Sequence, residues 1–355
     1  MAKRRSLILL VLLLFFVTPS TVLAHVKWFT DFSFADPPNS LDEVITPTFI
    51  GLALFTTAAL GLAVVIERLL GQTGWWRGIV QWFEERREYA PLALRIGLGM
   101  TLILSWQAET LLQPDLPVPH PVVGWIEFLL ALLLIFPRTV PLAGAGTLGL
   151  YGLAVVEFGG FYMLDYFIFV GVAIYLMVFN LENPRWRGLR IPALYFSVGF
   201  SLLWVALEKL VYPQWGLAIL SDNPVLTLGF EPEFFLVGAA FVELALGYLF
   251  VIGLLERPIA LLVTLVFFGT TMVFGKVEVI GHTIIHAALV VFLLEGTART
   301  YPAPVNIHRR LGRRIAFASV NFLLILGILL VPYAIIAQTQ YESAVAMLRS
   351  LLPIL

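Results

Sequence analysis

Long apolar runs separated by short polar loops are the feature that most constrains the fold of this chain. Only 13% of its 355 residues are charged, whereas 60% are hydrophobic. Soluble domains carry about 25% charged residues, so this chain has too few polar side chains to cover a surface that faces water. A run of roughly 20 apolar residues spans the hydrocarbon core of a bilayer as a helix. We therefore expect an all-α, polytopic membrane helix bundle whose outer surface contacts the lipid bilayer.

About ten of these runs approach the length of a transmembrane helix. They fall near residues 44–68, 92–112, 122–136, 140–157, 163–180, 193–212, 233–254, 258–274, 279–295 and 315–337. The N-terminus has a different pattern, with basic residues at 3–5, an apolar stretch at 7–17 and small residues up to Ala24. This pattern predicts a signal peptide at residues 1–24, cleaved after Ala24. The alternative is that the segment remains as an uncleaved signal anchor.

The arginines predict the orientation of the chain, because cytoplasmic loops of membrane proteins carry an excess of Lys and Arg. Nearly all the arginines fall on alternate loops, and the opposite loops hold only Lys27, Lys209, Lys276 and Arg349. We therefore expect a multi-pass protein of the bacterial inner (cytoplasmic) membrane with both mature termini in the periplasm. The expected parts outside the central helices are a periplasmic segment (25–43), a first transmembrane helix (44–70), a cytoplasmic interfacial helix (71–91), a last transmembrane helix (315–337) and a periplasmic amphipathic tail (338–355).

An internal repeat organises the middle of the sequence. The pattern E-x-L-x-x-P begins at Glu109 and again at Glu208, and the following apolar run carries Glu127 in the first copy and Glu243 in the second. Internal repeats of this kind occur in membrane transport proteins. The pattern predicts two tandem four-helix units, at residues 92–181 and 192–296.

The second unit resembles the DoxX family of small four-helix membrane proteins. The resemblance is carried by a glutamate–leucine pair, spaced glycines and a basic residue before the third helix, at Glu243-Leu244, Gly247, Gly253 and Arg257-Pro258. The first unit keeps a weaker version at Ile126-Glu127-Phe128 and Arg138, and a tandem arrangement departs from the single unit of the family.

The DoxX family is associated with quinone-linked sulfur oxidation and with membrane complexes that handle oxidative stress. The resemblance therefore implies a component of a quinone-linked or oxidative-stress redox system, with a quinone as candidate cofactor and another membrane redox subunit as candidate partner. Some related redox proteins use cysteine pairs, but this chain contains no cysteine. Thiol chemistry is therefore not expected.

Carboxylates within apolar runs are candidate catalytic residues, because an ionisable group in a bilayer costs several kcal/mol. Glu243 falls near the middle of a predicted helix, and Glu127 is its counterpart in the first unit; both are candidates for proton transfer. Glu208 and Glu109 fall at outer helix ends, where they would line a polar site that faces the periplasm. The alternatives are a neutral Glu243 that holds two helices in register by a hydrogen bond, and a simple charge pair between Glu208 and Lys209.

Four histidines are candidate metal ligands. His282 and His286 are four residues apart and share one helix face, a spacing that suits chelation but supplies only two ligands. If cleavage follows Ala24, His25 becomes the mature N-terminus, whose amine and imidazole form a chelate that favours copper. His120 or His282 would supply a further imidazole. The alternatives are packed or exposed histidines without a metal.

Three functions therefore remain open, and the sequence does not decide whether the chain is an enzyme. They are a redox component, a protein for periplasmic copper handling or transport, and a non-catalytic membrane assembly factor. The net charge of −1 excludes the basic surface of a nucleic-acid-binding protein. The sequence contains no phosphate-binding loop, nucleophile elbow or dinucleotide fingerprint.

Overall fold

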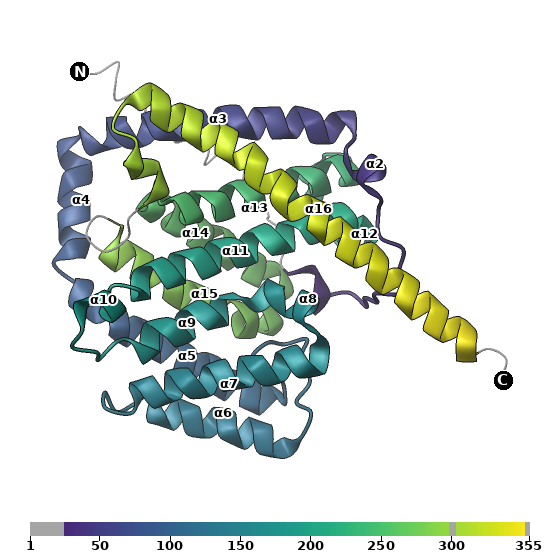
Figure 1. Ribbon diagram of the computed structural model, residues 1–355, viewed down its shortest axis with the longest axis horizontal. Coiled ribbons are helices and arrows are strands. Elements are labelled where there is room, and N and C mark those ends of the chain that lie inside the picture. The colour runs from purple at the N-terminus through teal and green to yellow at the C-terminus, as the bar shows by residue number, and fades with distance from the viewer. Residues whose placement is uncertain (1–24, 298–302, 352–355) are drawn as a thin grey trace.

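The chain folds into a helix bundle (Figure 1), seen in a computed structural model that describes residues 25–297 and 303–351. The predicted signal peptide at residues 1–24 lies outside the described residues. Within the described ranges there is no β-strand, and the only bridge joins Thr110 and Pro117. The predicted all-α fold is confirmed.

Eight helices of the described chain are long and apolar enough to cross a membrane. They are α3 (Pro47–Gly71), α5 (Ala90–Ala108), α7 (Val140–Phe158), α11 (Arg190–Val211), α13 (Pro232–Ile252), α14 (Glu256–Phe274), α15 (Lys276–Glu295) and α16 (Leu311–Leu351). A ninth candidate span is broken: α8 (Gly160–Met163) and η3 (Leu164–Tyr166) meet α9 (Ile168–Met177) at a bend of 65°. The chain is therefore a multi-pass membrane protein.

Two of the predicted runs differ from simple transmembrane helices. The run at 122–136 forms α6 (Pro121–Leu133), whose 13 residues span only about 20 Å. Pro137 explains this early end, because it has no N–H to donate to the Leu133 carbonyl four residues before it and its ring would clash with that carbonyl in a continued helix. The run at 163–180 breaks because the Ile168 amide donates to the Ser201 hydroxyl at 2.9 Å instead of continuing a helical ladder.

The two segments predicted to lie along the membrane surface also form helices. Helix α4 (Gly74–Glu84) buries none of its residues, and Trp75, Ile79 and Trp82 are exposed. The predicted C-terminal tail is not separate, because α16 continues through Pro332 to Leu351. Residues 334–351 contain no glycine or proline that would end it.

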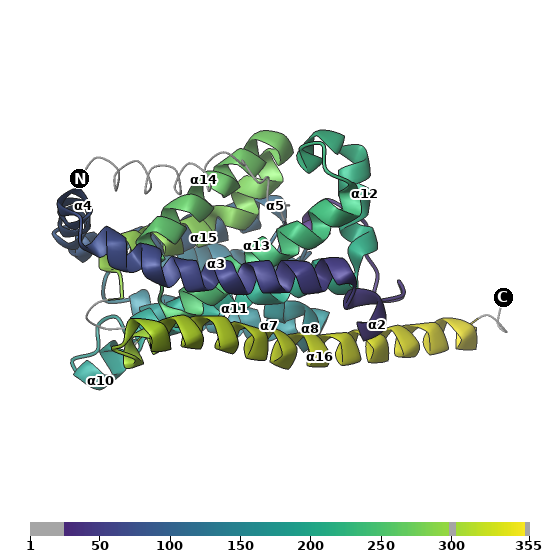
Figure 2. The ribbon, with the colours of Figure 1, turned by 90° about the horizontal axis from the view of Figure 1, so that it is seen from above.

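Helix α11 lies at the centre of the bundle and packs against α13 and α9, while α5 packs against α15. Helix α16 crosses α3 on one side of the bundle and extends beyond the other helices (Figures 1 and 2). The short helices α2 (Leu41–Val44) and α12 (Pro213–Asp222) mark one end of the bundle, and α4 and α10 (Pro184–Arg187) mark the other (Figure 1). We call the first of these the η1 end, after the 3-10 helix η1 (Val26–Trp28) that enters it.

Glycines allow α11 and α13 to approach closely. A Cβ atom on Gly247 would lie 2.6 Å from the Gly199 carbonyl oxygen and 3.0 Å from the Leu203 backbone nitrogen. Both contacts are with backbone atoms, which cannot rotate away as a side chain can. Small residues at helix crossings are a general means of close packing in membranes.

The substitution Gly247→Ala is expected to reduce the free energy of unfolding by about 1–3 kcal/mol, because it overpacks this crossing. Thermal unfolding of the purified protein in detergent measures the effect. Gly238→Ala on the same helix is the matched control, since a Cβ there would meet no atom within 4 Å. Equal effects of the two substitutions would contradict the close crossing.

Candidate functional site

The segment that follows the predicted cleavage site turns into the η1 end of the bundle. His25, Val26 and Lys27 are buried although they lie outside the long helices. The aromatic side chains of the same segment hold it in place: Phe29 stacks on Phe274 of α14 with ring centroids 4.4 Å apart. Burial of such aromatic rings contributes to the docking of a short segment on a bundle.

Lys27 forms the central contact of this segment. Its ammonium lies 2.6 Å from a carboxylate oxygen of Asp165 in η3 and 2.6 Å from one of Glu208 in α11. All three side chains are only 1% exposed. Burial alone would lower the pKa of Lys27, but the two carboxylates outweigh it and raise the pKa above its ordinary value. The lysine therefore stays charged, as a buried lysine does only beside opposite charges.

Aromatic rings complete the surroundings of the Lys27 ammonium. The ring centroid of Tyr162 lies 4.3 Å from the nitrogen, within the range of a cation–π interaction. The rings of Phe32 and Phe34 lie 5.6 Å away, and that of Trp215 lies 5.8 Å away. The ammonium thus sits in a box of two carboxylates and four aromatic faces, which we call the Lys27 box.

Asp115 joins the same region from the loop between α5 and α6. Its carboxylate accepts hydrogen bonds from the hydroxyl groups of Tyr162 and Tyr166, the latter at 2.6 Å. Burial raises the pKa of Asp115, and the two tyrosines and Lys27 oppose this rise. Tyr166 in turn accepts a hydrogen bond from the Trp28 indole at 3.1 Å. The loop, η3 and η1 are therefore tied together by polar contacts.

Glu243 is paired rather than isolated. Its carboxylate lies 2.8 Å from the ammonium of Lys209, which is fully buried on α11. Opposite charges in direct contact reduce the cost of keeping either group within a membrane. This pair links α11 and α13 near their close crossing.

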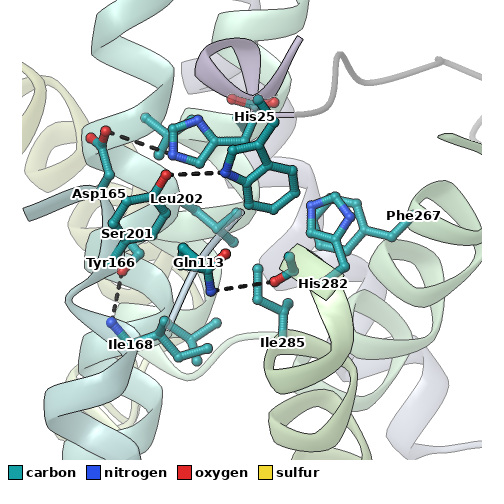
Figure 3. A pocket seen from close by; sticks show the side chains of 15 residues that line it. His25, Gln113, Asp165, Tyr166, Ile168, Ser201, Leu202, Phe267, His282 and Ile285 are labelled. Atoms are coloured by element: carbon teal, nitrogen blue, oxygen red, sulfur yellow. Dashed lines mark hydrogen bonds and ion pairs between the residues drawn. The ribbon is translucent and has the colours of Figure 1, made fainter. Parts of the chain in front are cut away.

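A cavity of about 50 Å³ lies beneath the Trp28 indole. That volume holds a few water molecules. The imidazoles of His25 and His282 both lie beside the cavity (Figure 3), and the Trp28 ring centroid lies 5.0 Å from that of His25 and 4.9 Å from that of His282. A Cβ on Gly281 would overlap the Trp28 indole, so only glycine at this position leaves room for the ring. The polar side chains that line the cavity are His25, Gln113, Asp165, Ser201, Glu243 and His282.

The two predicted histidine ligands of α15 have different surroundings. His282 contacts the carboxylate of Glu278 and stacks on Phe267 with ring centroids 4.0 Å apart. His286 stacks on Phe268, is half-buried and does not line the cavity. Across residues 25–297 and 303–351, no three His, Asp or Glu side chains are grouped so that they could hold one metal ion.

The remaining predicted site residues lie outside the cavity. Glu127 is fully buried and accepts a hydrogen bond from the Leu112 amide at 2.8 Å, so it holds the loop that carries Gln113. Glu109 is exposed at the end of α5, and His120 is exposed where its imidazole accepts a hydrogen bond that caps α6. The structure thus brings His25, Glu243 and His282 to one cavity, places Glu208 in the Lys27 box and leaves Glu109, His120 and His286 elsewhere.

Lys27, Asp115 and Asp165 are among the polar residues of this region that were not predicted as site residues, as are Gln113, Ser201 and Lys209. Asp165 carries one usable signal, because a shift of 117 residues in the repeat aligns it with His282. Both of these residues line the cavity. The sequence around Lys27 and Asp115 has no such signal.

The stability of the protein is expected to fall less steeply below neutral pH in a His25→Phe variant than in the wild type. Burial, together with the positive charges of Lys27 and Lys209, lowers the pKa of His25 well below 6.5. The unfolded chain therefore binds a proton at His25 first, and stability is lost as the pH falls through about 6.5. Thermal midpoints between about pH 7.5 and pH 5 measure this loss, with His308→Gln as the histidine control. Parallel curves for wild type and His25→Phe would contradict the depressed pKa.

A comparison with known protein families covers part of this region. Residues 197–276 match the DoxX family model, a stretch that runs from α11 into the start of α15 and includes Glu208, Lys209 and Glu243. No curated protein and no solved structure matches the chain. The predicted resemblance is confirmed, because this multi-pass membrane protein contains a DoxX-like region. That region supplies Glu208 of α11 and Glu243 of α13, two carboxylates of the buried ion pairs.

Proposed function

We propose that this chain is the proton-handling membrane component of a quinone-linked or oxidative-stress redox system, and that its cavity faces the periplasm. The observation that carries the proposal is the convergence of His25, Asp165, Glu243 and His282 on one small cavity within a membrane bundle. Carboxylates and imidazoles are the groups that most often transfer protons in proteins. The redox context is an inference from the DoxX-like region, and the periplasmic orientation is inferred from the distribution of arginines.

The size of the cavity limits what it can bind. About 50 Å³ is enough for a few water molecules and too small for a quinone ring. We therefore assign no quinone to the cavity and derive no step through one. The side chains of this chain would hold protons and pass them through water in the cavity, while a quinone and a partner subunit would carry the electrons.

Each carboxylate of the proposed path has a cation beside it. Asp165 contacts Lys27, and Glu243 contacts Lys209. An adjacent ammonium stabilises the ionised carboxylate, and the low polarity of the surroundings stabilises the protonated one. Opposing effects of this kind bring the two states closer in energy, as a proton relay requires. The Ser201 hydroxyl and the Gln113 amide line the same cavity and can orient its water.

Glu243→Gln and His282→Ala are each expected to lower quinol turnover in membranes by about 10²-fold, the lower end of what a proton-transferring side chain contributes. The control is Glu109→Gln, because Glu109 is another carboxylate of the repeated units but is exposed outside the cavity. Unchanged turnover in both cavity variants would refute the proposal. A stable partner in pull-downs together with that result would support a non-catalytic assembly factor.

A double variant separates loss of the relay from loss of the fold. Glu243→Gln alone leaves the buried Lys209 ammonium without its partner, which costs about 3–5 kcal/mol of stability. Lys209→Met combined with Glu243→Gln removes both charges and is expected to recover most of the thermal midpoint while turnover stays low. Recovery of turnover together with stability would mean that Glu243 has only a structural role.

Copper handling is the second candidate function, because both ring nitrogens of His25 are buried without a hydrogen bond among the described residues. The chelate would also need the main-chain amine of His25, which is free only after cleavage behind Ala24. N-terminal sequencing tests the cleavage, and metal analysis of the purified protein tests the binding. Retention of Met1 would remove the proposed chelate.

A further inference from the structure

We propose that the η1 end of the bundle contains a recognition site for a primary ammonium group, which Lys27 occupies as an intramolecular ligand. The proposal concerns the Lys27 box and does not depend on the redox function proposed above. Its natural ligand class is a small primary alkylammonium ion, the chemical group that the lysine side chain presents.

Most of the walls of the Lys27 box belong to the bundle and not to the segment that carries the lysine. Asp165 comes from η3, Glu208 from α11, Tyr162 from α8 and Trp215 from α12. Lys27 itself enters on η1, which is only three residues long. The box is therefore largely built before the lysine enters it, as a binding site is built before its ligand arrives.

The charges of the box require an occupant. Carboxylate oxygens of Asp165 and Glu208 each lie 2.6 Å from the position of the Lys27 ammonium, and water is excluded from this buried position. If η1 withdraws, the two negative charges face each other, and one must take up a proton or a cation must replace the lysine. An ammonium group donates a hydrogen bond to Asp165, forms an ion pair with Glu208 and also attracts the ring of Tyr162 at 4.3 Å.

Occupation of the box controls the cavity beneath it. The residues on either side of Lys27 in this segment include His25 and Trp28, which line the cavity. The ring centroid of the Trp28 indole lies 5.0 Å from that of His25 and 4.9 Å from that of His282, and the indole fits against Gly281. An external ammonium ion that displaced Lys27 would release η1 from the cavity, so the lysine holds this part of the cavity wall in place.

Chemical complementation tests the site. Lys27→Ala removes three methylene groups and the ammonium, which n-propylammonium replaces in size and charge. The full-length variant is expected to have a lowered thermal midpoint, and millimolar n-propylammonium is expected to raise it by an amount that grows with concentration. n-Propanol is the uncharged control and is expected to have no such effect. The wild type is expected not to respond at these concentrations, because its tethered lysine competes at a high effective concentration and an external ion must exceed that concentration to displace it. Equal responses to the ammonium ion and the alcohol, or none, would overturn the proposal.

Cysteine labelling gives a second test, because the chain has no cysteine of its own. In membranes, Lys27→Cys is expected to react faster with a cationic aminoethyl thiosulfonate than with its anionic sulfonatoethyl counterpart, by on the order of tenfold or more. Ser33→Cys, exposed on the same segment, supplies the baseline ratio of the two reagents. The aminoethyl adduct also regenerates a lysine-like side chain and is expected to restore the thermal midpoint. If the ratio of the two labelling rates at Lys27→Cys equals that at Ser33→Cys, the result counts against an ammonium site. This holds whether the box is absent or the variant is unfolded.

Discussion

The ion pairs of Lys27 with Asp165 and Glu208 are the contacts on which the η1 end of the bundle depends. A buried ammonium without partners is too costly to keep, and so are two carboxylates held close together in the same place. Each group therefore requires the others, and their joint burial fixes η1 against η3 and α11. Because η1 is fixed in this way, Trp28 lies beside the cavity and its ring contacts those of His25 and His282.

The sequence predicts the helices well because lipid imposes a simple requirement on them. Every spanning segment must be apolar and must satisfy its own backbone hydrogen bonds, so length and hydrophobicity suffice to locate it. Glu243 and His282 are found for the same reason, since a charge or an imidazole stands out in an apolar run. The bend before α9 is missed because it depends on Ser201, 33 residues away from Ile168. The end of α6 carries a local signal in Pro137, which the hydrophobicity of the run conceals.

The candidate site is less predictable because its contacts join distant parts of the chain. Lys27 lies 138 residues from Asp165, and no local pattern pairs them. The repeat predicts that Glu208 and Glu109 occupy matching positions, but it does not predict their surroundings. Glu208 is buried beneath η1, whereas Glu109 is exposed. The segment that carries η1 covers only the helix end at Glu208, so the two copies of the motif have different surroundings. The two tandem units remain a prediction from the sequence pattern.

The distance along the chain between Lys27 and its partners has a consequence for biosynthesis. Lys27 leaves the ribosome 138 residues before Asp165 and still longer before Glu208. The segment that carries Lys27 must therefore remain in contact with water until η3 and α11 have been inserted and packed. Its docking is then a late event that reports on the correct assembly of helices from both halves of the protein. A chain with one misplaced helix would leave the ammonium and the aromatic residues beside it exposed, which are features that membrane quality control can detect.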